Sequence, residues 1–198
     1  MEFFRLPLLT APGQVMTPRA ATEVLVAEAL ERIGDRPARV VDVGTGSGAI
    51  AVAVATAAPR AEVWATDTSR AAVALARANV RLHGLGERVT VLHGDLLDPV
   101  PGPLDLVVAN LPYVPIADAH AYPDLAGEPE SAVFAAGDGL EPYRRLLAAC
   151  RERLDDDAAV VIQLHRAVLA ATLAELPVLE ERVERYAPPH LVPRLIAA

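Results

Sequence analysis

The sequence predicts an α/β protein built on a doubly wound, mostly parallel sheet with helices on both faces. Strand-length runs of apolar residues alternate along the chain with amphipathic helical patterns. The runs are apolar almost throughout, as strands buried on both faces are. A glycine-rich turn, residues 44–48, joins one such run directly to a helical segment. In sheets of this kind ligands bind at the carboxyl ends of the strands, so functional residues are expected there.

The elements are expected in a simple order. Residues 1–17 form a short extended lead-in, and residues 18–198 form one domain that opens with a helix over 18–30. Five strands are expected at 38–44, 61–67, 88–95, 104–110 and 158–165, with helices at 49–58 and 69–84. Residues 181–198 are expected to supply two more strands and close a seven-stranded sheet. The longest irregular segment, 112–142, is rich in Pro, Gly, Asp and Glu, and loops of that length are usually functional.

Composition narrows the function classes. The 198 residues are 53% hydrophobic and carry a net charge of -8, which disfavours nonspecific binding to nucleic acid. No apolar run reaches the roughly 20 residues of a membrane span, and the first residues lack the pattern of a secretory signal. The single cysteine, Cys150, cannot form an internal disulfide, which fits a cytoplasmic protein. All 18 basic residues are arginine, so a lysine nucleophile is excluded, and the histidines show no metal-ligand spacing.

The strongest local signal is the turn after the first sheet strand. Asp42 precedes Gly44, Thr45, Gly46 and Gly48 in a D-x-G-x-G-x-G pattern, and a helix follows. Glycines let the backbone approach a ligand closely, and free amides at the helix start favour anionic or carbonyl oxygens. Read loosely, the turn also satisfies the dinucleotide fingerprint. The third glycine and the preceding acid resemble motif I of the class I S-adenosylmethionine (SAM) methyltransferases, in which the turn holds the amino acid end of SAM.

Two further acids follow strands. Asp67, with Thr68 beside it, ends the second strand about 20 residues beyond the turn, where a carboxylate can accept both ribose hydroxyls. This acid indicates a nucleoside but suits a nicotinamide cofactor equally well. Asp95 ends the third strand, and in the methyltransferases an acid there accepts from the adenine amino group while the next residue, here Leu96, packs on the ring. The resemblance therefore implies a Rossmann-like class I SAM methyltransferase fold with SAM as the cofactor.

The fourth strand ends in Asn110, Leu111, Pro112 and Tyr113. This sequence resembles the [D/N/S]-[P/L/I]-P-[Y/F/W] motif of methyltransferases that act on the nitrogen of a planar amide or an exocyclic amine. Such a nitrogen is a poor nucleophile because its lone pair is delocalised. The Asn110 side-chain oxygen and the Leu111 carbonyl can each accept one N–H, which orients the lone pair toward the methyl group. Pro112 fixes the turn, and the Tyr113 ring can pack against the flat substrate group.

Residues 12–164 as a whole resemble the HemK/PrmC-type glutamine methyltransferases, which methylate a glutamine side-chain amide in peptide chain release factors. Two more segments carry the resemblance. Residues 15–30 match the family's P-R-P-E-T-E helix start, and residues 127–147 match its E-P…G-D-G-L-x-x-Y-R segment. The matching residues are Pro18, Arg19, Thr22, Glu23, Glu128, Pro129, Gly137, Asp138, Gly139, Leu140, Tyr143 and Arg144. Leu111 stands where the family has proline, but that position acts through its backbone carbonyl.

The resemblance has two departures. Fewer than 20 residues precede the P-R-x-x-T-E segment, so we expect a short form without the family's N-terminal helical module. A partner subunit can replace that module, or the acceptor can be a small amide or amine. The family's glutamate after the fifth strand is absent, and we interpret the nearby His165 as structural. Two competing hypotheses are a noncatalytic SAM-binding or scaffold subunit, and a nicotinamide-dependent oxidoreductase, which Asp42 and Gly48 disfavour.

Overall fold

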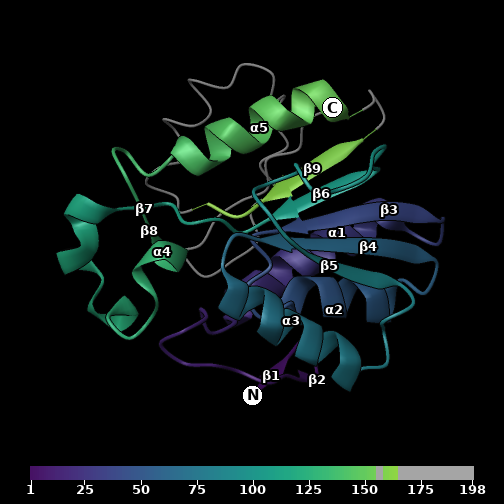
Figure 1. Ribbon diagram of the computed structural model, residues 1–198, viewed down its shortest axis with the longest axis horizontal. Helices are drawn as coiled ribbons and strands as arrows, with labels where there is room; N and C mark the ends of the chain where they lie inside the picture. The colour runs from purple at the N-terminus through teal and green to yellow at the C-terminus, as the bar shows by residue number, and fades with distance from the viewer. Residues whose placement is uncertain (155–157, 165–198) are drawn as a thin grey trace.

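A five-stranded parallel sheet forms the centre of the molecule (Figure 1). The computed structural model describes residues 1–154 and 158–164. Its strand order is β5-β4-β3-β6-β9, and every neighbouring pair is parallel. The bounds are β3 Ala38–Val43, β4 Ala61–Asp67, β5 Val89–His93, β6 Leu106–Ala109 and β9 Ala159–Ile162. His165 and the two strands expected in 181–198 lie outside the described residues.

Helices cover both faces of this sheet (Figure 1). On one face lie α1 Glu23–Ile33, α2 Ala49–Ala57 and α3 Arg70–Leu82, and on the other lies α5 Glu141–Arg153. Successive strand residues serve opposite cores: Val40 packs with residues of α1 and α2, whereas Val41 packs with residues of α5. Burial on both faces explains why the strands read as continuous apolar runs. The predicted doubly wound α/β class is confirmed.

The order of the strands indicates where in the fold a ligand site is expected. The chain runs outward from β3 to β4 and β5, then crosses back to β6 on the other side of β3. The crossovers therefore diverge between β3 and β6, and a crevice opens at the carboxyl ends of those two strands. The glycine turn follows β3 and Asn110 follows β6, so both segments lie at this switch point.

The core on the α5 face includes Cys150, a free and buried thiol. Burial raises its pKa to about 12, which keeps it protonated and unreactive at neutral pH. Within residues 1–154 and 158–164, no helix combines the length and the apolar character needed to cross a bilayer.

The N-terminal segments differ from their predicted form. The lead-in contains a small hairpin, β1 Glu2–Phe3 with β2 Leu6–Pro7, and the buried Phe3 anchors it in the core. The helix expected over 18–30 begins only at Glu23, after a 3-10 turn over Ala20–Thr22. Residues before this turn make tertiary contacts instead of helical ones, because the Thr17 N–H donates to Glu128 at 3.0 Å.

Residues 112–142 are also more regular than predicted. They contain β7 Val114–Pro115, η2 Ile116–Ala121, η3 Pro123–Leu125, α4 Glu130–Val133 and β8 Phe134–Ala135. β7 and β8 pair in parallel, and a small core of Val114, Leu125 and Val133 lies beneath them. This unit projects beyond the strand ends at the left of Figure 1. Each element is too short to leave a periodic pattern in the sequence.

Candidate functional site

Asp42 holds the glycine turn from beneath. Its Oδ2 accepts a hydrogen bond from the Thr45 hydroxyl at 2.6 Å and another from the Ala51 N–H at 3.1 Å. Burial raises the pKa of Asp42 to about 7, although both hydrogen bonds act in the opposite direction. Asp42 and Gly48, both predicted to bind cofactor, do not line the cavities described below. The Asp42 side chain therefore supports the glycine turn and does not face these cavities.

Asp67 joins the same turn to the end of β4. Its Oδ2 accepts from the Gly46 N–H at 2.9 Å, and its Oδ1 accepts from the Ser69 N–H at 2.8 Å. The Thr45 N–H donates to the Thr66 carbonyl at 2.9 Å, which ties the turn to β4 a second time. Each carboxylate oxygen can accept more than one hydrogen bond, so Asp67 retains acceptor capacity for a ligand.

The first cavity, of about 220 Å³, opens above this turn at the carboxyl ends of β3, β4, β5 and β6. Nine of the predicted site residues line it: Gly44, Gly46, Asp67, Thr68, Asp95, Leu96, Asn110, Leu111 and Pro112. Thr45 lines a small recess of about 60 Å³ on the other side of the turn. The sequence reasoning thus identified most of the lining, from four separate strand ends.

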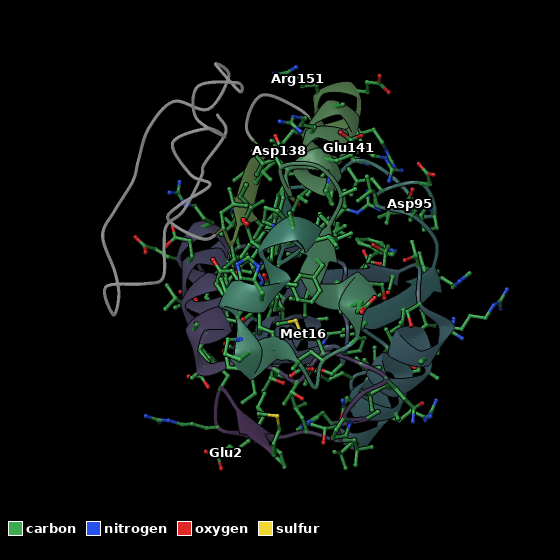
Figure 2. The ribbon with its side chains drawn as sticks, turned by 90° about the vertical axis from the view of Figure 1, so that its left-hand side faces the viewer. Glu2, Met16, Asp95, Asp138, Glu141 and Arg151 are labelled. Atoms are coloured by element: carbon green, nitrogen blue, oxygen red, sulfur yellow. The ribbon has the colours of Figure 1, made fainter. Side chains whose placement is uncertain are left out.

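The far end of the first cavity carries an ion pair that the sequence did not reveal. Arg145, on α5, pairs with Asp95, and both residues line the cavity. In Figure 2 Asp95 lies beside the first turn of α5, where Glu141 is labelled. Leu96, the next residue, has a positive φ of 44°, and its carbonyl accepts from the Thr66 hydroxyl at 2.9 Å. That bond holds the Asp95–Leu96 segment against β4.

Asn110 is oriented by a residue from the N-terminal part of the chain. Its Nδ2 donates to the Thr22 hydroxyl at 3.2 Å, and Thr22 is itself buried. Because the nitrogen end of the amide is engaged in this way, the Oδ1 end remains available as an acceptor. The P-R-x-x-T-E segment and the Asn110 segment therefore meet at one side chain.

Leu111 packs directly over the glycine turn. Gly44 has a φ of +69°, and a Cβ added there would lie only 2.7 Å from Leu111 Cδ2. The Leu111 N–H donates to the Tyr143 hydroxyl at 3.0 Å, and the Leu111 carbonyl lies 3.0 Å from the same hydroxyl. Tyr143 thus contacts both polar groups of the residue that follows Asn110.

A second cavity, of about 510 Å³, lies on the other side of the Asn110 segment. Its lining includes Arg19, Thr22, Asn110, Leu111, Pro112, Tyr113, Tyr122 and Gln163. Burial raises the pKa of the Tyr113 phenol, against the opposing effect of Arg19, so the ring stays neutral. Both cavities are also lined by Met16, which lies at the centre of the face shown in Figure 2. Asn110, Leu111 and Pro112 therefore form a wall common to the two cavities.

Comparison with known proteins assigns the family. Residues 18–123 match the family model of the methyltransferase small domain. A release factor glutamine methyltransferase from Deinococcus radiodurans is 41% identical over 171 residues, covering 85% of this chain and 60% of that relative. Relatives of the same name from Moorella thermoacetica and Geobacter sulfurreducens are 46% and 40% identical, covering 74% and 82% of this chain. The chain belongs to the release factor glutamine methyltransferase family.

The chain aligns with only part of the length of each relative named above from the release factor glutamine methyltransferase family. The chain spans 60%, 52% and 57% of the lengths of the three relatives named above. Solved structures share the fold at lower identity. Ribosomal protein L11 methylase from Lactobacillus delbrueckii subsp. bulgaricus has a TM-score of 0.69 at 23% identity, covering 93% of this chain and 81% of its own. Human methyltransferase 10 domain containing protein has a TM-score of 0.66 at 16% identity, covering 98% and 89%. The predicted class I methyltransferase fold is thereby confirmed.

Residues that sequence reasoning noted without a role acquire one in this family member. Gly139 has a φ of +85°, and a Cβ there would lie 2.3 Å from the Tyr113 carbonyl oxygen, so the G-D-G-L turn packs against the Asn110–Tyr113 segment. Asp138 accepts from Arg144 at 3.0 Å, and this hydrogen bond holds the pKa of Asp138 at about 2. Thr22 and Tyr143 also lie in the two segments, 15–30 and 127–147, that resemble the family in sequence. Arg145 and Gln163 were missed, because nothing in the local sequence marks either as a site residue.

Proposed function

We propose that this chain is a SAM-dependent methyltransferase that acts on the side-chain amide nitrogen of a glutamine in a peptide chain release factor. The observation that carries the proposal is the wall of Asn110, Leu111 and Pro112, which lines two cavities at once. A cofactor in one cavity and an acceptor in the other would meet at this wall. The name that the relatives share, release factor glutamine methyltransferase, supports this choice of acceptor.

The chemistry of the first cavity suits SAM. Gly44 and Gly46 offer backbone without a Cβ to the amino acid end of the cofactor. The Asp67 carboxylate suits the ribose hydroxyls, and the Asp95 carboxylate suits the adenine amino group, with Leu96 against the ring. When bound, SAM supplies an electrophilic methyl group on a positively charged sulfur.

The residues of the shared wall suit a planar amide. The Asn110 Oδ1 and the Leu111 carbonyl oxygen each accept one N–H of the substrate amide, which holds its nitrogen facing the first cavity. This arrangement lowers the entropic part of the barrier and stabilises positive charge that develops on the nitrogen. The nitrogen held in this way would receive the methyl group that SAM supplies, and it would release one N–H proton to solvent. No charged base is required, and none of the residues that form the wall is charged.

The second cavity suits the end of a protein side chain. Tyr113 and Tyr122 supply flat faces, and Tyr113 stays neutral, so an uncharged carboxamide fits their chemistry. A release factor is a cytoplasmic protein, and a buried free thiol at Cys150 is compatible with that compartment.

Methyl transfer to a release factor tests the proposal. The purified chain is incubated with methyl-labelled SAM and a release factor, and the label is located by mass spectrometry. Asn110→Ala is expected to bind SAM, as measured by a rise in melting temperature, yet to lose transfer. Asp118→Ala, an exposed residue of η2, serves as a control that keeps both. Label on a small amide but not on the release factor would favour a small acceptor. Transfer only after a second protein is added would indicate a partner subunit.

A further inference from the structure

Tyr143 brings the ends of two strands together through one oxygen atom. It lies in the first turn of α5, and its side chain is completely buried. Its hydroxyl accepts from the Leu111 N–H at 3.0 Å and lies 2.6 Å from the Gln163 carbonyl oxygen and 3.0 Å from that of Leu111. Leu111 follows β6 and Gln163 follows β9, so the hydroxyl links the two strands at the place where the second cavity opens.

Gln163 is itself fixed to the other strand. Its backbone N–H donates to the Ala109 carbonyl at 3.0 Å, and its own carbonyl receives the Tyr143 hydroxyl. The Tyr143 hydroxyl is therefore fixed by Gln163, which is itself bonded to β6, and it holds Leu111 at a set position relative to Gln163. Leu111 follows Asn110 directly, so the peptide group between these two residues also belongs to the shared wall.

The hydroxyl has one proton and two carbonyl neighbours. Burial raises the pKa of Tyr143 well above its usual value, so the phenol keeps its proton at every physiological pH. The shorter contact directs that proton to Gln163, while the phenol oxygen accepts from the Leu111 N–H. A carbonyl oxygen has two lone pairs, so the Leu111 carbonyl keeps acceptor capacity for a substrate N–H.

We propose that Tyr143 is a positioning residue for methyl transfer: its hydroxyl accepts from the Leu111 N–H, fixes the Asn110–Leu111 peptide group, and so holds the backbone from which the Leu111 carbonyl meets the acceptor. This proposal rests on the proposed function, in which that carbonyl accepts one N–H of the substrate amide. A phenylalanine would fill the same volume but would leave the Leu111 N–H and the Gln163 carbonyl without this partner. The Asn110–Leu111 peptide group would then lose the bond that fixes it, and the Leu111 carbonyl that follows would shift relative to the acceptor.

Tyr143→Phe tests the proposal, with Leu146→Val as its control. Leu146 lies on the same helix, is completely buried and packs in the same core, but it makes no polar contact with the wall. The kcat of Tyr143→Phe is expected to fall about 10- to 100-fold, the loss typical of a misplaced reacting group. The Kd for SAM is expected to stay within about twofold of wild type. Leu146→Val is expected to lower the melting temperature. When kcat is measured about 20 degrees below the melting temperature of this variant, it is expected to equal that of wild type.

The outcomes for Tyr143→Phe and for the wild-type chain distinguish failure of the positioning role from failure of the proposed function. A folded Tyr143→Phe chain with wild-type kcat overturns the positioning role and leaves the proposed function intact. A wild-type chain that methylates no amide contradicts the proposed function, and this proposal with it. If Tyr143→Phe does not fold, amide hydrogen exchange on the wild-type chain replaces it. Slow exchange of the Leu111 N–H supports its fixation by the Tyr143 hydroxyl, and exchange as fast as in an exposed loop overturns the proposal.

Discussion

Replacing Asp42 by asparagine is expected to make the stability of the ligand-free chain much less sensitive to pH. Asparagine keeps an oxygen for the Thr45 hydroxyl and the Ala51 N–H but cannot ionise. The pKa of Asp42 is raised from 3.8 to about 7 by burial. Below pH 4 the carboxyl is protonated in both the folded and the unfolded chain, so its burial carries no charge penalty.

Between pH 4 and pH 7 the unfolded chain loses this proton while the folded chain keeps it. Unfolding is then favoured by about 1.4 kcal/mol for each pH unit, and the sum over this window is roughly 4 kcal/mol. Above pH 7 the folded group ionises as well, and the penalty stays constant. The contribution of Asp42 to stability is thus complete below pH 4 and lost as the pH rises to about 7.

Urea unfolding at pH 5 and at pH 8 measures the effect. The free energy of unfolding of Asp42→Asn, relative to wild type, is expected to rise by about 3 kcal/mol between these two values, because two of the three units lie in this interval. Thr45→Val removes a hydrogen bond that lowers the pKa of Asp42 but keeps the ionisable group, so its free energy of unfolding is expected to fall between pH 5 and pH 8 at least as much as that of wild type. Parallel pH curves for Asp42→Asn and wild type would refute the reasoning, since Asp42 would then be ionised in the fold throughout.

Three further substitutions test the site. Thr22→Val is expected to lower kcat about tenfold with unchanged SAM affinity, because the amide of Asn110 loses the acceptor that orients it, whereas Thr22→Ser retains that acceptor and the activity. Gly139→Ala forces a Cβ to within 2.3 Å of the Tyr113 carbonyl at a φ of +85°, and is expected to cost about 2–3 kcal/mol in urea unfolding. Gly86→Ala, where a Cβ meets nothing within 4 Å, is the neutral control for that measurement. Asp95→Asn is expected to weaken SAM binding about tenfold by calorimetry while changing stability by less than about 1 kcal/mol, because its ion pair with Arg145 is largely exposed.

The parts of the fold that could be predicted are those with a local signature. The run 38–43 is apolar enough for a strand buried on both faces, and Gly44 follows it with the backbone freedom that the turn requires. The residues at the ends of β3, β4 and β6 could also be located, because parallel strands bring their carboxyl ends to one edge. Asp67 and Asn110 accordingly line the same cavity.

Contacts between distant segments could not be predicted from one sequence. Asn110 meets Thr22 across 88 residues, and Tyr143 meets Leu111 across 32. Periodicity indicates which face of a helix is buried, but it does not identify the polar group that a buried hydroxyl contacts. For the same reason Asp42 was expected at the ligand, whereas the fold turns its side chain inward beneath the glycine turn.

The most direct test of the account is the position of the transferred methyl group. Tandem mass spectrometry of a release factor treated with the chain and labelled SAM is expected to find one methyl on the side-chain amide nitrogen of a single glutamine. Asn110→Ala is expected to abolish it while SAM still raises the melting temperature. A methyl group on a charged amine or a carboxylate would contradict the central claim that Asn110 and the Leu111 carbonyl orient an amide nitrogen. An Asn110→Ala chain with undiminished transfer would contradict it equally.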